Sequence, residues 1–250
     1  YKQMTECFSE IFAQSQLDRE RIKTLTNRNI KFIGNLKLSS GSNIQQISLD
    51  KKLINFQKGR TLMLASTHEN EEFQFLSTIK RLLLQVDGLK IIIAPRHPER
   101  SRTIQSIYQK SGISTKLMSD NAYANGDVLI VNTFGNLPAY FNISDIVFLG
   151  GSFVSKGGHN PIEPAINNCV IITGPHVYNW QNIYEDMLRN NACFVFNKIS
   201  ILEKKIKKLF EDNNEMNKMK ENSKKVAQKN FFDSSELIYI IKNILEVSPC

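Results

Sequence analysis

Glycines and polar side chains that could bind a ligand or take part in a reaction concentrate in residues 150–164, which read GGSFVSKGGHNPIEP. This stretch holds four of the 12 glycines, one of the 4 histidines, Lys156 and Glu163. The apolar run 145–149 before it predicts a buried strand, and Pro161 suits the start of a helix. A glycine-rich loop between a strand and a helix N-terminus would aim N–H groups at an anion such as a phosphate. The spacing fits neither a P-loop nor a GxGxxG fingerprint, so an ordinary turn is the alternative.

Four more polar clusters each follow an apolar run that predicts a buried strand. The clusters are residues 66–72, 95–100, 132–136 and 173–176, and the runs before them are 61–65, 89–93, 127–131 and 170–172. In parallel sheets covered by helices, ligands bind beyond the carboxyl ends of the strands. Histidine, arginine, glutamate and glycine at successive strand ends therefore predict a binding site along that edge.

The elements that must position these clusters alternate regularly. Strands are predicted at the five runs above and at 193–196, with helices at 71–86, 99–110 and 137–141 and further helical patterns behind the later strands. Near-continuous apolar strands alternating with helices indicate an α/β fold with a doubly wound, Rossmann-like parallel sheet. The helix at 71–86 is predicted to present Phe73, Leu76, Ile79 and Leu83 on one face. Glu71 and Glu72 are adjacent and diverge on a helix, so we expect one of them to be solvated.

Two smaller pieces flank this pattern. The N-terminal piece is predicted to form a strand at 11–15, a helix at 16–25 and a strand at 30–33, which is too little for a domain of its own. Residues 39–43 are polar and turn-like, as in a linker, and 233–245 predict a last amphipathic helix. The chain begins at Tyr1 rather than at a methionine, so we expect a fragment of something longer.

Composition narrows the class of protein. The chain has 250 residues, 41% hydrophobic and 22% charged, with a formal net charge of +8, which fits a globular protein with a core. Ten lysines lie within 198–229; nucleic acid, an anionic membrane or an acidic substrate could meet them, but a solvated helix surface is the favoured interpretation. Aromatic residues are not interleaved with these lysines, which argues against nucleic-acid binding.

The 4 cysteines have no metal-ligand spacing and predict a reducing compartment, with Cys169 a core thiol. No run approaches the roughly 20 apolar residues of a membrane span.

Taken together, the motifs resemble the 3-deoxy-D-manno-oct-2-ulosonic acid (Kdo) transferases of Gram-negative lipopolysaccharide synthesis. The matching strings are Gly34–Lys37, Ala65–Glu72, Pro95–Arg100, Thr133–Leu137, Gly150–Pro164 and Gly174–His176. The resemblance runs from about Ile11 onward, and the run 157–164 is its most specific part.

The resemblance implies the C-terminal half of a GT-B glycosyltransferase. In that family the N-terminal domain holds the acceptor, the membrane anchor and a catalytic carboxylate, and the C-terminal domain binds CMP-Kdo. Residues 1–38 then correspond to a remnant of the acceptor domain and linker, and 39–232 to the donor-binding domain. Residues 233–250 would be a helix that crosses back to the N-terminal domain. The family's catalytic-base motif has no counterpart here, so no catalytic residue is expected in this chain.

The resemblance also implies which residues touch the donor. Those that match the nucleotide-contacting segments are Pro95, Arg96, Phe134, Gly135, Asn136, Asn160, Pro161, Ile162 and Glu163. Further possible donor contacts are Ser66, Thr67, His68, Lys156 and His159. One segment departs from the family: Asp-Thr-Met-Gly-Glu-Leu is replaced by Asn-Thr-Phe-Gly-Asn-Leu at 132–137, which loses two acidic side chains.

These residue types suit a nucleoside monophosphate leaving group. Arg96 offers a planar fork for phosphate or carboxylate, and the helix start near Asn160 offers N–H groups. Glu163 can accept both ribose hydroxyls, as acidic residues do in nucleotide-binding folds. No metal and no cofactor are expected.

Each assignment has a structural alternative. Arg96 could instead pair with Glu99 on the surface, and Glu163 could cap a helix start. His68, His97 and His159 could be loop histidines that bind no substrate.

The function implied is transfer of Kdo from CMP-Kdo to a lipid A precursor, lipid IVA, at the cytoplasmic face of the bacterial inner membrane. The partners implied are the CMP-Kdo donor, the lipid A precursor and the inner-membrane surface, with no nucleic acid. One alternative is a truncated, inactive remnant that binds a nucleotide or a partner chain. Another is a GT-B enzyme with a uridine donor.

Overall fold

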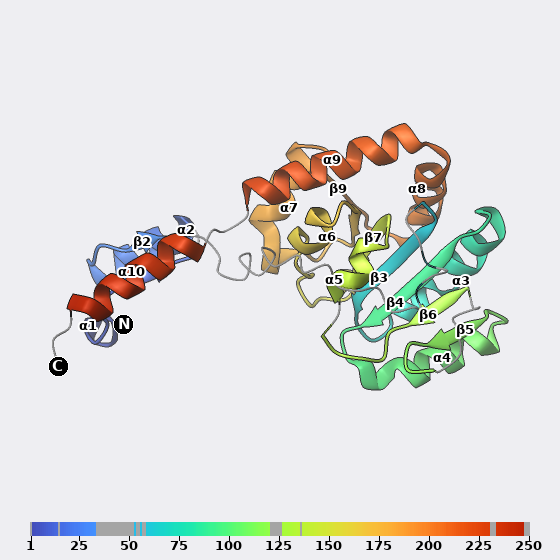
Figure 1. The fold of residues 1–250 in the computed structure, drawn as a ribbon, viewed down its shortest axis with the longest axis horizontal. Helices are drawn as coiled ribbons and strands as arrows, with labels where there is room; N and C mark the ends of the chain where they lie inside the picture. Colours follow the sequence, from blue (N-terminus) through green and yellow to red (C-terminus); the bar gives the residue numbers. More distant parts are fainter. Residues whose placement is uncertain are drawn as a thin grey trace. The chain divides into compact units, whose positions relative to one another are not determined.

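The computed structural model describes residues 2–14, 16–33, 53, 56, 59–120, 127–135, 137–230 and 234–247. The chain divides into two compact units, one of Tyr1–Gln45 with Asn230–Cys250 and one of Gln46–Lys229 (Figure 1). The linker predicted at 39–43 and the matching string at 34–37 lie outside the described residues.

The larger unit is built on a sheet of seven parallel strands. They are β3 (Thr61–Thr67), β4 (Lys90–Pro95), β5 (Thr115–Leu117), β6 (Val128–Ile130), β7 (Ile146–Leu149), β8 (Val170–Thr173) and β9 (Cys193–Val195). Their order is β5-β6-β4-β3-β7-β8-β9, and every pair is parallel. This confirms the predicted doubly wound sheet. Only β5 was not predicted, because three residues with a lysine at their centre carry no apolar run.

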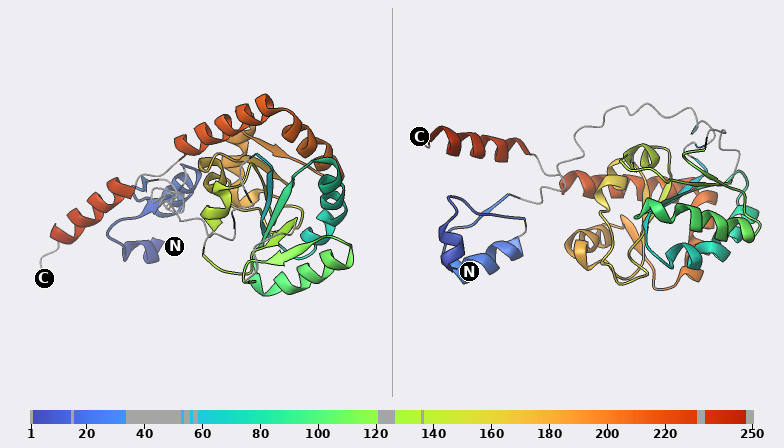
Figure 2. Two further views of the ribbon diagram at one scale, coloured as in Figure 1. Left: turned by 45° about the vertical axis from the view of Figure 1, so that its right-hand side comes forward. Right: turned by 90° about the horizontal axis from the view of Figure 1, so that it is seen from below.

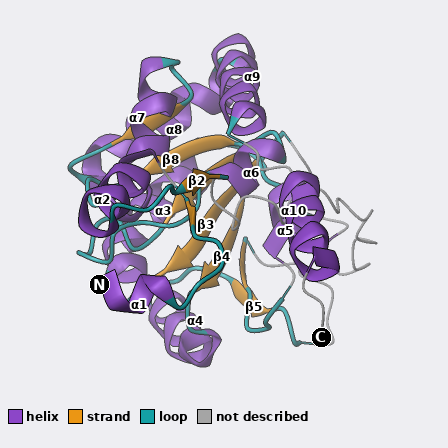
Figure 3. Cartoon of the chain, turned by 90° about the vertical axis from the view of Figure 1, so that its left-hand side faces the viewer, coloured by secondary structure: helices purple, strands orange, loops and turns teal. Residues whose placement is uncertain are grey.

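Helices cover both faces of the sheet (Figure 3). They are α3 (Glu71–Gln85), α4 (Ser101–Lys110), α5 (Leu137–Asn142), α6 (Ile162–Ile166), α7 (Gln181–Arg189), α8 (Ile199–Glu211) and α9 (Asn213–Lys229), with 3₁₀ turns η3 (Pro98–Arg100) and η4 (Tyr178–Trp180). Alternate strand residues such as Leu62 and Leu64 join α3, α4 and α8 in one apolar core. The intervening Met63 and Ala65 are also fully buried, as expected for strands covered on both sides.

The buried face of α3 differs from the prediction. Phe73 is 64% exposed, whereas Phe75, Ile79 and Leu82 are buried. Glu71 at the first position of the helix points inward and sets the phase, so the buried stripe continues four residues later at Phe75. Phe73, counted as a core residue from periodicity alone, lies on the solvent side.

A buried ion pair joins α9 to the amino ends of the strands. Lys220 Nζ lies 2.6 Å from Asp145 Oδ1, and the second Asp145 oxygen accepts N–H groups from Gly59 and Thr61 at 2.6 and 3.1 Å. The solvated interpretation of the lysine-rich region is therefore wrong for Lys220. It is confirmed for exposed lysines such as Lys224 and Lys225.

The strand order reverses between β3 and β7. From β3 the chain passes through α3 to β4, and from β7 it passes through α6 to β8 on the opposite side. Loops that leave two such neighbours diverge, and the crevice between them is the usual ligand site of an open α/β sheet.

The smaller unit contains short elements. They are α1 (Lys2–Glu6), β1 (Phe12–Ala13), α2 (Gln16–Thr26), β2 (Lys31–Phe32) and α10 (Ser234–Val247) (Figure 2). The predicted strand, helix and strand are confirmed, with β1 and β2 parallel, while α1 was not predicted. In the described part of the chain, no helix has the length and apolar character that a bilayer crossing requires. That the last helix packs on an acceptor domain stays a prediction.

Candidate functional site

The carboxyl end of β3 is irregular and tightly packed. Ser66 has a left-handed backbone with φ 55°, and the pairing of β3 with β4 shifts register between Ala65 and Thr67. A Cβ on Gly150 would lie 2.5 Å from the Ser66 carbonyl oxygen, so only glycine fits there. A left-handed serine is strained, and such strain concentrates at functional sites. The last residues of β3 and the first residue after β7 thus meet directly.

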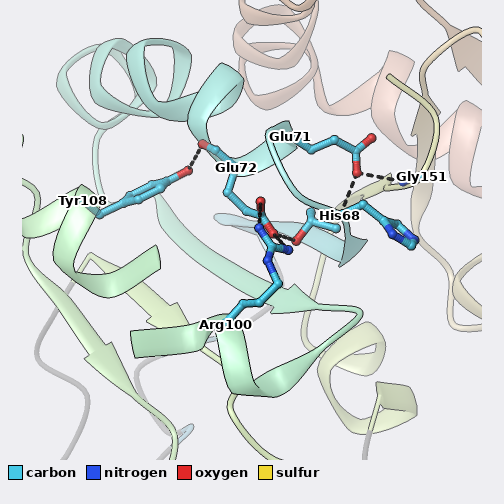
Figure 4. Close-up of polar contacts among 7 residues, drawn as sticks. His68, Glu71, Glu72, Arg100, Tyr108 and Gly151 are labelled. Carbon is cyan, nitrogen blue, oxygen red and sulfur yellow. Dashed lines mark hydrogen bonds and ion pairs between the residues drawn. The ribbon is translucent and has the colours of Figure 1, made fainter. Parts of the chain in front are cut away.

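Glu71 fixes the start of the glycine-rich loop through hydrogen bonds to its backbone. Its carboxylate accepts four backbone N–H groups, from His68 at 2.9 Å, Gly151 at 2.7 Å, and Ser152 and Phe153 at 3.0 Å each. Figure 4 shows Glu71 turned toward Gly151, and its side chain is 0% exposed. The opening N–H groups of the loop, predicted to face a ligand anion, therefore bind an internal one.

Glu72 faces the other way. Arg100 forms a two-pronged ion pair with it at 2.9 Å for each contact, and the Thr67 hydroxyl donates to it at 2.7 Å (Figure 4). Tyr108 donates its hydroxyl to the Glu72 carbonyl at 2.9 Å. Glu72 is 3% exposed, so the expectation that one of the two glutamates is solvated is wrong, although they do diverge. Thr67 is buried, and its hydroxyl hydrogen is already used within the protein.

The rest of the glycine-rich loop is held by the chain after β8. Tyr178 donates its hydroxyl to the Ser155 carbonyl at 3.0 Å, and the Asn179 amide donates to the Lys156 carbonyl at 2.9 Å. Gly157, with φ 86°, packs so closely on Tyr178 and Asn179 that any Cβ there would collide with them. The Lys156 side chain is exposed on a loop whose backbone is fixed.

Two histidines that were predicted as possible donor contacts, His68 and His159, lie against each other next to this loop. His68 Nε2 and His159 Nε2 are 3.1 Å apart, their rings lie within 14° of parallel, and a Cβ on Gly151 would touch both rings. Burial lowers the pKa of His68, partly offset by the nearby Glu71 carboxylate. Burial, with smaller contributions from His68 and Arg96, lowers the pKa of His159 to about 4. Because His68 follows β3 and His159 lies in the loop after β7, the pair lies at the strand reversal.

A pocket of about 250 Å³ lies at the ends of β3, β4 and β6, and neither histidine of the pair is among its lining residues. It brings together five predicted site residues: Ser66, Pro95, Arg96, Phe134 and Gly135. Phe134 is 79% exposed, an unusual position for a large apolar side chain in a folded domain. Asn136 lies outside the described residues.

Arg96 does not form the surface ion pair considered as its alternative. Glu99 instead lies 3.6 Å from His97 Nδ1, and no ion pair involving Arg96 occurs within the described ranges. The backbone N–H of Arg96 donates to the Thr67 carbonyl at 2.9 Å. This bond fixes the backbone and leaves the guanidinium exposed at the pocket.

The second predicted nucleotide segment forms the start of α6. Asn160 Oδ1 accepts the Ile162 N–H at 2.9 Å, and the Asn160 amide donates to Glu163 Oε1 at 3.2 Å. Pro161 and Ile162 are buried, and Glu163 is half-buried. Burial raises the pKa of Glu163, and the Asn160 hydrogen bond opposes that rise. These four residues do not line the pocket, and α6 is only five residues long, so its dipole is small.

Sequence reasoning missed the internal roles of Glu71, Glu72 and Arg100. Their partners lie as far as 82 residues away in the chain, and most are backbone N–H groups. The available signal was the position of two carboxylates at the first turn of a helix beside a glycine-rich loop. In the described residues, no group of three histidine, cysteine or acidic side chains could hold a metal ion.

The doubly wound sheet and the solved structures that share it place the chain among the GT-B glycosyltransferases. A crystal structure of a glycosyltransferase from Rickettsia africae ESF-5 aligns over 99% of this chain and 67% of its own, with a TM-score of 0.59 and 15% identity, which concerns the fold alone. The C-terminal CMP-Kdo binding domain of WaaA from Acinetobacter baumannii is 28% identical, with a TM-score of 0.63, over 70% of this chain and 91% of that domain.

The sequence comparison finds curated Kdo transferases among the relatives of the chain. The 3-deoxy-D-manno-octulosonic acid transferase of Rickettsia bellii is 32% identical over 240 residues, 94% of this chain and 57% of the relative. No family model matches the chain. The chain is similar to 3-deoxy-D-manno-octulosonic acid transferases over nearly its whole length, as its motifs indicated, and it spans a little over half the length of the curated relatives it matches.

Proposed function

We propose that this chain supplies the donor-binding part of an enzyme that transfers Kdo from CMP-Kdo to a lipid A precursor. The observation that carries the proposal is the pocket at the strand-end edge, where Arg96 and Phe134 are exposed in a chain similar to the Kdo transferases. Because the chain covers only part of its relatives' length, the acceptor and the inner-membrane location belong to the proposal for the whole enzyme.

The donor's nucleotide has a partner for each of its parts. We place the phosphate at the Arg96 guanidinium, whose planar fork matches two phosphate oxygens. The exposed ring of Phe134 packs on the cytosine base, since aromatic side chains stack well on nucleobases. Glu163 has one oxygen engaged by the Asn160 amide, and we assign the other to the ribose hydroxyls.

The reaction makes CMP a leaving group. The acceptor hydroxyl oxygen forms a bond to the anomeric carbon of Kdo as the bond from that carbon to the phosphate oxygen breaks, and CMP departs with the electron pair. Arg96 stabilises the negative charge that develops on the phosphate. We assign no general base to this chain, so the group that takes the acceptor proton belongs to the remaining part of the enzyme.

Calorimetric titration with CMP tests the donor site. We expect weak CMP binding to the chain and a loss of affinity of about 10- to 100-fold in Glu163→Ala, the range for charge-assisted hydrogen bonds to the ribose. Glu211→Ala, which removes an exposed carboxylate from the end of α8, is the matched control. UMP distinguishes the uridine alternative. Unchanged CMP affinity in Glu163→Ala would remove the ribose assignment, and tighter binding of UMP would overturn the cytidine donor.

A transfer assay tests the division of labour. Assayed alone with CMP-Kdo and lipid IVA, the 250-residue chain is expected to transfer no Kdo. Transfer is expected when a polypeptide corresponding to the remaining part of a relative is added. Transfer by the chain alone would place the general base within it. CMP binding without transfer in either mixture would favour the inactive remnant.

A further inference from the structure

The histidine pair His68–His159 can hold one proton more than its neutral form, but not two. Its Nε2 atoms face each other at 3.1 Å, the distance of a hydrogen bond in which one ring donates and the other accepts. A single added proton makes one ring an imidazolium and preserves that bond. A second would set N–H against N–H. The pair therefore has two stable charge states, neutral and +1.

Charged groups from several elements face this pair. Glu71 of α3 favours a protonated His68, whereas His97 after β4, Lys156 in the glycine-rich loop and Arg96 all oppose it. Arg96 also opposes protonation of His159. The Glu71 carboxylate already accepts four backbone N–H groups, so these donors partly compensate its negative charge. Burial and the cationic neighbours both oppose protonation of the pair in the free protein.

The cations that oppose protonation are themselves available to a ligand. Lys156 and Arg96 are exposed, and within the described ranges neither forms an ion pair. An anion that binds them would cancel their repulsion of the histidine pair and would attract a proton to it. The pair also lies where β3 and β7 diverge, the position at which such sheets bind ligands.

We propose that His68 and His159 form an anion site that takes up one proton when an anionic group of the nucleotide-sugar donor binds beside Arg96 and Lys156. The inference rests on the proposed function and extends it from the nucleotide to the charge of the donor. Two anionic groups of the donor share the required chemistry, the phosphodiester and the sugar carboxylate. In the bound state one added proton gives the pair of imidazoles a single positive charge next to the bound anion.

The direction of the pH dependence follows from linkage. In the free protein the pKa of each histidine lies below the usual 6.5, and a bound anion raises it. Donor affinity therefore rises as pH falls through the interval between the bound and free pKa values, by at most about tenfold per pH unit for one proton. Above the bound pKa the affinity is independent of pH, because neither state carries the proton.

Calorimetry in two buffers of different ionisation enthalpy measures the proton directly. The probe is the methyl ester of CMP, a phosphodiester that does not itself titrate at about pH 6, near the ordinary pKa of histidine. Cytidine has no anionic group, and CMP-Kdo has both. We expect proton uptake of up to one per bound ligand and none with cytidine. Uptake with the methyl ester identifies the phosphodiester as the source, and uptake with CMP-Kdo alone identifies the carboxylate.

Variants and a spectroscopic reading assign the proton. His68→Gln and His159→Gln are expected to abolish the uptake and to flatten the pH dependence, while His176→Gln, at the end of β8, retains both. Ring ¹⁵N shifts of the unmodified protein report the same protonation without any substitution. CMP-Kdo binding without uptake, or uptake that persists in both pair variants, would overturn this inference alone. Failure of the unmodified protein to bind any of the nucleotides would reject the proposed function and this inference with it.

Discussion

Two regions at the same edge of the sheet differ in whether their charged groups are buried or exposed. At the carboxylate junction, defined here as Glu71, Glu72 and their partners, both carboxylates are buried and each is met by internal groups. At the pocket rim, defined as Arg96, Phe134 and Gly135, the residues are exposed and line a cavity. In the sequence both regions are polar residues just after an apolar strand. The difference shows that such clusters include groups that hold the loops in place as well as groups that stay exposed at a pocket.

The physical reason is the cost of burying charge. A buried carboxylate is tolerated only when hydrogen bonds or an ion pair replace its hydration, so its partners must be complete before any ligand arrives. An exposed guanidinium keeps its water and can exchange it for a ligand oxygen. Substitutions at the junction should therefore alter stability first, and substitutions at the rim should alter binding without altering stability.

The largest effect is expected at Glu71. In Glu71→Gln, the amide NH₂ would face backbone donors whichever way the amide is turned, and we expect a loss of about 3 kcal/mol in the free energy of unfolding. For a domain of this size that lowers the melting temperature by roughly 6–12 °C. Thermal unfolding followed by circular dichroism measures it.

Glu69→Gln is the matched control for this prediction. Glu69 is exposed in the same loop, so its substitution should change stability by no more than about 0.5 kcal/mol. Equal melting temperatures for the two variants would show that the junction carboxylate of Glu71 contributes no more stability than an exposed one.

A smaller loss is expected at Arg100. Arg100→Leu leaves Glu72 buried with only the Thr67 hydroxyl on its carboxylate, and because the arginine is partly exposed we expect about 2 kcal/mol. Arg102→Leu, an exposed arginine on the next turn, makes the same chemical change without a buried partner. If the two variants unfold at the same urea concentration, the Arg100–Glu72 pair contributes no stability.

The sheet could be predicted because its strands bury both faces. Runs such as 61–65 and 145–149 are continuous in apolar residues, and their alternation with helices leaves few topologies. The short β5 lacked such a run, and it forms because β6 offers it a parallel partner. The inward phase of α3 was not predictable from periodicity, because a charged residue, Glu71, occupies the buried position.

The gathering of polar clusters at the strand ends could be predicted, but not the different roles of the residues within them. Arg96 and Phe134 were identified through motif resemblance, and the structure places both at the pocket. The four bonds of Glu71 were invisible because backbone N–H groups leave no trace in residue type. The contact of His68 with His159 joins residues 91 apart, and no local pattern predicts which histidine of the chain meets another.

The smallest effect is expected at the rim itself, where Phe134→Ala tests binding without stability. Because the ring is 79% exposed, its removal should leave the melting temperature unchanged. CMP affinity should fall about five- to tenfold, since stacking of a base on an aromatic ring contributes on the order of 1 kcal/mol or more. Phe73→Ala, which removes an equally apolar ring that is 64% exposed on α3, should leave CMP affinity unchanged. A loss of stability in Phe134→Ala, or an equal loss of affinity in Phe73→Ala, would show that rim residues do not act by contact with the nucleotide.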